Sequence, residues 1–216
     1  MSFIAPMPDS TDLSQRLLAQ LRFPCGDVPE PGDIKNVAPG IWWLRMPLPF
    51  ELDHINLWLI EDDGGWFVLD TGLDTKDCKA GWDAVLDGPL KGEHLTRILA
   101  THFHPDHVGL VGWLHERFGL PLTMTRTEYL FSTTARMGTG DMTGEYHRDF
   151  YRTNGLSQPD TDAILGRGSN YLRLTTGVTT HFDRIEHGDI VRIGGRDFDV
   201  LTGGGHALEQ AMLYRR

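Results

Sequence analysis

Residues 101–107 read Thr101-His102-Phe103-His104-Pro105-Asp106-His107, directly after the apolar run Ile98-Leu99-Ala100. A strand points alternate side chains to one face, so His102 and His104 would leave the end of this predicted strand on the same side. Pro105 suits the first position of a following helix because its ring fixes φ and it lacks an N–H. The first turn of that helix would then present Asp106 and His107 beside the two histidines.

These four side chains are of the types that bind a zinc-like metal ion. Imidazole nitrogens and a carboxylate are typical ligands, and here four of them fall between residues 102 and 107. The alternative is a strand-to-helix turn that is rich in histidine without binding a metal, as a single histidine would suggest. Two histidines at i and i+2, followed by an adjacent aspartate and histidine, instead predict a metal site.

Two further segments accompany this motif. Asp70-Thr71-Gly72 ends an earlier predicted strand, and Gly205-His206 follows a later one. The H-x-H-x-D-H motif, in this order with those two segments, resembles the metallo-β-lactamase-fold hydrolase superfamily over residues 37–216. Within it, the chain most resembles the broad glyoxalase-II-like group. The resemblance implies an α/β fold of the αββα sandwich type and a metal site, but it does not select one reaction.

The resemblance also implies a set of metal ligands. His102, His104 and His206 correspond to the histidines that hold the first ion, and Asp106 and His107 contribute to the second. Zinc is the expected cofactor, as one ion or as two, with iron or manganese as alternatives. Many relatives have Thr-Pro-Gly-His before the last of these histidines, whereas this chain has only glycines there, a departure that loosens the loop.

Asp70 has a different expected role. In the family that the chain resembles, the matching aspartate supports the metal site from behind the ligands, where such a carboxylate fixes the tautomer and orientation of a ligand histidine. The alternative is an aspartate that caps a turn through its own backbone. The histidine motif downstream favours the supporting role.

The composition is that of a soluble globular protein, with 40% hydrophobic and 23% charged residues. The net charge of −10 argues against nucleic acid as a partner, because an acidic surface repels phosphate. The chain shows neither a signal-peptide pattern nor an apolar run long enough to cross a bilayer. We therefore expect a cytoplasmic protein with a small-molecule substrate and no membrane partner. Cys25 and Cys78 are expected to be reduced thiols, with a disulfide between them as the alternative.

The chain is expected to form one domain over residues 1–216. Residues 1–36 would be an N-terminal arm with a short helical pattern, and residues 37–124 the first αβ half with the metal motif. Residues 125–180 read as a helical insertion or cap, and residues 181–216 as the start of the second half. Hydrophobic patterns predict a helix over 75–90 and strands at 41–44, 55–60, 66–69, 97–100, 190–193, 198–201 and 211–214.

The insertion is polar and carries several aromatic and basic side chains. In relatives, helices at this point often lie over the mouth of the active site and shape the substrate pocket. The alternative is an excursion that packs on the side of the sandwich, and helix amphipathicity does not separate the two. His147, with Tyr146 beside it, is the candidate substrate contact from this segment.

The chain ends at Arg216, while the family that it resembles continues and supplies an aspartate bridging both metals and a final histidine. After His206 the only acidic residue is Glu209, so the second metal position has Asp106 and His107 alone. A half-finished sandwich would expose a sheet edge and an apolar surface. The expectation is therefore a piece of a longer enzyme, with a chain whose ordered part ends here and a natural short form as alternatives.

The resemblance implies a metal-dependent hydrolase that uses a zinc-bound hydroxide to cleave an ester, thioester or lactone, with Asp106 orienting the nucleophile. One alternative keeps the fold and uses a single iron to oxygenate a thiol or persulfide. Another is a catalytically impaired short form that acts by binding only. Cleavage of β-lactams is not expected, since fold does not fix function. A homodimer is common in such folds, although no residue here demonstrates it.

Overall fold

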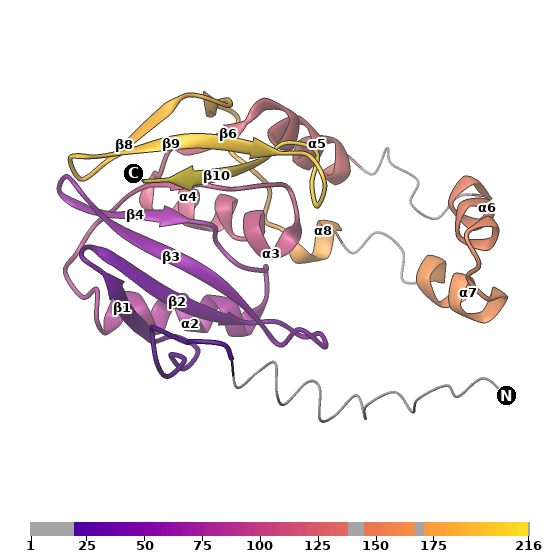
Figure 1. The fold of residues 1–216 in the computed structure, drawn as a ribbon, viewed down its shortest axis with the longest axis horizontal. Helices are drawn as coiled ribbons and strands as arrows, with labels where there is room; N and C mark the ends of the chain where they lie inside the picture. The colour runs from indigo at the N-terminus through magenta and orange to yellow at the C-terminus, as the bar shows by residue number, and fades with distance from the viewer. Residues whose placement is uncertain (1–19, 138–144, 167–170, 216) are drawn as a thin grey trace, which may run out of the picture.

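The computed structural model describes residues 20–137, 145–166 and 171–215. The described chain contains a seven-stranded sheet in the order β1-β2-β3-β4-β5-β6-β7 and a three-stranded sheet in the order β10-β9-β8 (Figure 1). Most of the helical pattern predicted for the N-terminal arm falls on residues 1–19, outside the described part. The mixed α/β class predicted from the sequence is confirmed.

The first four strands pair with one another in antiparallel fashion. They are β1 (Ile34–Ala38), β2 (Ile41–Pro47), β3 (His54–Asp62) and β4 (Gly65–Leu69). The predicted hairpin of β3 and β4 turns through Asp63 and Gly64, and Gly64 adopts a φ of 81°, which a glycine tolerates without a steric penalty. The hydrophobic strands therefore pair as their sequence pattern indicates.

The remaining strands of this sheet run parallel to one another and to β4. They are β5 (Leu95–Leu99), β6 (Leu122–Thr125) and β7 (Asp183–Ile185). The helices between β4 and β6 are α2 (Lys76–Asp87), α3 (Pro105–Val108) and α4 (Val111–Phe118). Because parallel strands end at the same edge of a sheet, the segments after β4 and β5, which start with Asp70 and Ala100, lie side by side.

The second sheet packs on the first through a separate hydrophobic cluster. Its strands are β8 (Ile190–Ile193), β9 (Arg196–Gly203) and β10 (Gln210–Tyr214). Ile60, Phe67 and Leu99 of the large sheet contact Ile193 and Val200 of the small one, all nearly or fully buried. A larger cluster, which includes Trp82 of α2 and Leu114 of α4, fills the space between the other face of the large sheet and the helices.

The described residues thus form three layers: helices, large sheet and small sheet. The predicted sandwich has a fourth, helical layer, and no described helix buries the outer face of the small sheet. Large apolar side chains are exposed there: Ile190, Leu201, Met212 and Tyr214. No helix in the described part of the chain has the length and apolarity to span a bilayer. Cys25 is exposed and Cys78 buried, and both are free thiols.

The segment between β6 and β7 is helical, as predicted. It contains α5 (Arg126–Arg136), α6 (Glu145–Thr153), α7 (Gln158–Gly166) and α8 (Tyr171–Leu174). Figure 1 shows α5 and α8 against the body of the protein, whereas α6 and α7 pair with each other away from it.

Replacing Phe67 with alanine should lower the free energy of unfolding by about 3–5 kcal/mol, because a fully buried ring between the two sheets would leave a cavity. The exposed Phe50 offers the control, since Phe50→Ala should change stability by no more than about 0.5 kcal/mol. Urea unfolding of both variants measures this. Equal effects would mean that the two sheets do not pack through Phe67.

Candidate metal centre

The local structure of the histidine motif follows from its sequence. His102 comes after the end of β5, and α3 begins at Pro105 with His104 as its N-cap residue. Asp106 and His107 stand in the first turn of that helix, as predicted. Thr71 fixes the position of this helix, because the backbone N–H and the hydroxyl of Thr71 both donate to the His107 carbonyl oxygen at 2.8 Å.

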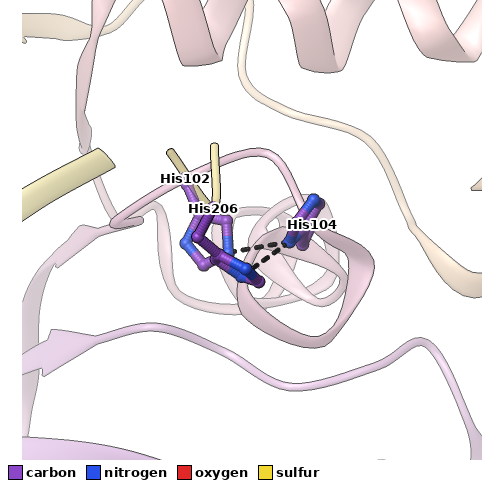
Figure 2. Close-up of side chains that lie close together, drawn as sticks. All are labelled: His102, His104 and His206. Atoms are coloured by element: carbon purple, nitrogen blue, oxygen red, sulfur yellow. Dashed lines mark hydrogen bonds between the residues drawn. The ribbon is translucent and has the colours of Figure 1, made fainter. Parts of the chain in front are cut away.

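Three histidine side chains converge on one point (Figure 2). Nε2 of His102 lies 3.0 Å from Nδ1 of His104, which lies 3.1 Å from Nε2 of His206. These three nitrogens are all within 4.8 Å of one another. Tetrahedral zinc with bonds of about 2.0–2.1 Å separates its nitrogen ligands by about 3.3 Å, so the spacing fits one ion. The tertiary structure brings His206 to the motif across 102 residues of sequence.

The protonation of these rings also suits a metal. Burial lowers the pKa of His102 to about 3, and the nearby charge of His107 adds to the effect. Burial likewise lowers the pKa of His104, together with the adjacent His206. A neutral imidazole offers a lone pair, whereas a protonated one does not. At neutral pH the two motif histidines can therefore bind a cation without first losing a proton.

Asp70 and Thr101 determine which ring nitrogen of His102 carries its proton. A carboxylate only accepts, so the Thr101 hydroxyl donates to Asp70 Oδ2 at 2.9 Å. The Thr101 hydroxyl oxygen can then accept only from Nδ1–H of His102, at 2.9 Å. With the proton on Nδ1, Nε2 of that ring is unprotonated. The backbone N–H of Thr101 donates to Asp70 Oδ1 at 2.7 Å and holds the carboxylate in place. Asp70 thus fixes the tautomer and orientation of His102 through Thr101.

Asp70 also contacts His107 directly. Nδ1 of His107 lies 2.8 Å from Asp70 Oδ2, and Nε2 of the same ring lies 3.4 Å from Asp106 Oδ2. Burial alone would lower the pKa of His107, but the two aspartates outweigh it and raise that pKa to about 10. Burial would raise the pKa of Asp106, but its hydrogen bond to His107 outweighs this and lowers it.

Asp106 and His107 adjoin the three converging histidines without belonging to that group. The rings of His102 and His107 have centroids 4.0 Å apart. Because Nε2 of His107 points to Asp106, the two could share a second cation once that nitrogen releases its proton. Their role as ligands of a second ion stays a prediction.

The two residues proposed as substrate contacts lie elsewhere. Tyr146 is 76% exposed on α6, and its ring contacts that of His147 at 5.5 Å between centroids. Among the described residues, no hydrogen bond or ring contact joins either residue to the three histidines, and Figure 1 shows α6 apart from α3. A substrate role for this pair stays a prediction.

Two side chains near the histidines were not predicted as site residues. Glu128 of α5 is fully buried, and its Oε2 accepts the Phe103 N–H at 3.0 Å. Tyr171 of α8 donates its hydroxyl to the Phe103 carbonyl oxygen at 2.8 Å. A lone glutamate in a polar helical stretch carries no sequence signal for this role, and Tyr171 was one of several aromatic residues there.

A cavity of about 500 Å³ opens beside the histidines, within the range of small-molecule sites. His104 and His206 form part of its wall, and Phe103, Phe131 and Leu208 provide most of its apolar surface. The rings of Phe103 and Phe131 contact each other at 4.5 Å between centroids. An organic molecule in this cavity would therefore reach the converging nitrogens with an apolar group against the two phenyl rings.

The chain matches one protein-family model and several solved structures. The family model of the Metallo-beta-lactamase superfamily matches residues 51–209. The chain is similar to a Beta-lactamase domain protein from Burkholderia ambifaria, with 37% identity and a TM-score of 0.73 over 88% of this chain and 56% of that one. No curated protein sequence matches the chain.

More distant structures share the fold. A metallo-beta-lactamase family protein from Thermus thermophilus is 22% identical, with a TM-score of 0.65 over 83% of this chain and 57% of that one. A Metallo-beta-lactamase from Pontibacter korlensis is 13% identical, with a TM-score of 0.52 over 85% of this chain and 66% of that one. This chain spans between half and two thirds of the length of these structures.

Replacing Asp70 with asparagine should lower the pKa of His107 from about 10 by about 1 to 3 pH units, because the ring loses a charged acceptor. The stabilisation from protonated His107 is fully present below the unfolded pKa of about 6.5 and is lost as pH rises toward 10. Asp70→Asn should therefore remove stability below pH 10.

NMR titration of the metal-free protein measures this pKa. Asp63→Asn removes an exposed carboxylate and serves as the control for net charge. An unchanged His107 pKa in Asp70→Asn would contradict the assignment of Asp70 as its partner.

Proposed function

Because the chain belongs to the metallo-β-lactamase superfamily, whose members are mostly metal-dependent hydrolases, we propose that it hydrolyses an ester, thioester or lactone with the help of bound zinc. His102, His104 and His206 would hold the ion. The observation that carries this proposal is the convergence of three ring nitrogens, two of them on rings whose pKa values are lowered, at a spacing that fits one tetrahedral ion.

The residues around the ligands would have separate roles in the reaction. A bound divalent cation lowers the pKa of its water to about 7 and so supplies a nucleophile at neutral pH. Asp70 keeps the ligand nitrogen of His102 free of protons through Thr101, and it orients His107 directly. Asp106, whose pKa is lowered, remains an acceptor at neutral pH and could orient the attacking water or bind a second ion.

The adjoining cavity supports a substrate with an apolar portion. Phe103, Phe131 and Leu208 line the cavity next to two of the three ligands, and none of the described acidic, lysine or arginine side chains lines it. A group placed there gains free energy by leaving water, about 25 cal/mol per Å² of buried apolar surface. The acyl chain of an ester or thioester matches this chemistry better than a phosphate or a sugar.

Replacing His104 with alanine should abolish both zinc binding and hydrolysis, because it removes the nitrogen that lies between the other two ligands. The control variant His181→Ala removes an exposed histidine that is distant in sequence from the motif. It should change neither zinc binding nor hydrolysis. Elemental analysis of the purified chains, followed by a screen of aryl esters and thioesters, measures both. Turnover in zinc-free protein would contradict the proposal, and iron with oxygen uptake would favour the oxygenase alternative.

If the substrate is an ester, the apolar wall of the cavity leads to a second prediction. The specificity constant kcat/KM should rise with acyl length from acetyl to hexanoyl, and Phe131→Ala should flatten this rise because the chain loses its apolar wall. Leu130→Ala, an exposed neighbour on the same helix, is the matched control. A chain-length dependence that is the same in wild type and Phe131→Ala would exclude this cavity as the acyl site.

A further inference from the structure

Glu128 connects the two loops that carry the three histidines. Its Oε2 accepts the N–H of Phe103, the residue between His102 and His104, at 3.0 Å. Its Oε1 accepts the backbone N–H of Glu209, three residues after His206. The side chain is fully buried at the start of α5, and both of its oxygens are used in this way.

Other bonds from the same region hold these two loops. Tyr171 donates its hydroxyl to the carbonyl oxygen of Phe103 at 2.8 Å, so both backbone polar groups of that residue are bound by side chains of the helical insertion. The Thr125 hydroxyl donates to the Glu209 carbonyl oxygen at 3.0 Å, and the Thr127 N–H donates to the Glu209 side chain at 3.2 Å. Among these residues of the insertion, Glu128 is the one that bonds to both loops.

The loop that carries His206 requires hydrogen bonds of this kind to hold its position. Three consecutive glycines, Gly203 to Gly205, precede His206, and glycine has the largest backbone freedom to lose. His206 itself is exposed, and the ring contacts that the structure gives it are to His102 and His104, at 5.0 and 4.6 Å between centroids. Metal ligands must nevertheless be held close to their binding positions before the ion arrives. Otherwise the entropy lost in ordering them weakens the affinity for the ion.

We propose that Glu128 is a positioning residue of the metal centre, whose carboxyl group sets the separation between the His102–His104 loop and the His206 loop. This inference rests on the metal site of the proposed function. Glu128 does not touch the ion, since both of its oxygens are occupied by backbone N–H groups. It acts by ordering the three nitrogens in advance and thereby raises the affinity for zinc.

The test replaces Glu128 with glutamine, which keeps the shape but turns one acceptor into a donor. An amide N–H would then face the N–H of Phe103 or of Glu209, so one of the two loops loses its bond. Asp62→Asn is the matched control. Asp62 is a largely buried carboxylate that accepts the Gly194 N–H at 2.8 Å and the Thr96 hydroxyl at 2.8 Å, and it connects two strand segments remote from the histidines.

Zinc affinity of the full 216-residue chain is measured by competition with a chromophoric chelator, and thermal unfolding is followed on the metal-free protein. Both variants should unfold at a lower temperature than the wild type. Only Glu128→Gln should raise the zinc Kd, by about 10- to 100-fold, which is the usual effect of losing a group that supports metal ligands. Cobalt substitution should also show an altered visible absorption spectrum in Glu128→Gln alone.

A Glu128→Gln protein with wild-type zinc affinity and cobalt spectrum, destabilised only as much as Asp62→Asn, would overturn the proposal and leave Glu128 a purely structural residue. If Glu128→Gln does not fold, Glu128→Asp keeps the carboxyl group but shortens the side chain by one methylene, so the two oxygens no longer reach both N–H groups. That variant should also bind zinc more weakly, and unchanged affinity would then overturn the proposal. A wild-type chain that binds no zinc would instead refute the proposed function.

Discussion

The hydrogen bonds of the Asp70 carboxyl group are the constraint on which the rest of the site depends. Parallel pairing of β4 with β5 places Asp70 beside Thr101, and the backbone N–H of Asp70 donates to Leu99 at 2.9 Å. Asp70 adopts a φ of 64°, a left-handed conformation that aspartate tolerates better than most residues, although at some cost. That conformation directs one carboxyl group to both Thr101 and His107. A single side chain thus orients two histidines of the motif.

The helical insertion contributes to the site in an unexpected way. The sequence does not decide whether it lies over the mouth of the active site or packs on the side of the sandwich, and its described helices differ in where they lie. α5 and α8 supply Glu128 and Tyr171, which hold the Phe103 peptide between His102 and His104, whereas α6 and α7 lie apart (Figure 1). α5 also supplies Phe131 to the apolar wall of the cavity. The part of the insertion nearest the three histidines therefore holds the loops that carry them and shapes the space beside them.

The small sheet has two different faces. Its inner face is buried against the large sheet through Ile193 and Val200, whereas its outer face exposes Ile190 and Met212. In strands the side chains alternate between faces, and the outer face also carries the exposed ion pair of Arg192 with Asp197. The similar structures are longer than this chain, which spans between half and two thirds of each.

The sequence alone predicted seven of the ten described strands, the histidine motif and its place at a strand end, but not β1, β6 or β7. These follow from local patterns: alternation of apolar residues, proline at the first helical position and histidines two apart. It also indicated Asp70 and His206, but only through a resemblance, because their approach to the motif is not encoded locally. The tertiary structure alone decided that Nε2 of His206 lies 3.1 Å from Nδ1 of His104, and that Glu128 bonds to both ligand loops. Contacts of this kind depend on how strands from distant parts of the chain align, and a glutamate that accepts backbone N–H groups leaves no pattern in the sequence.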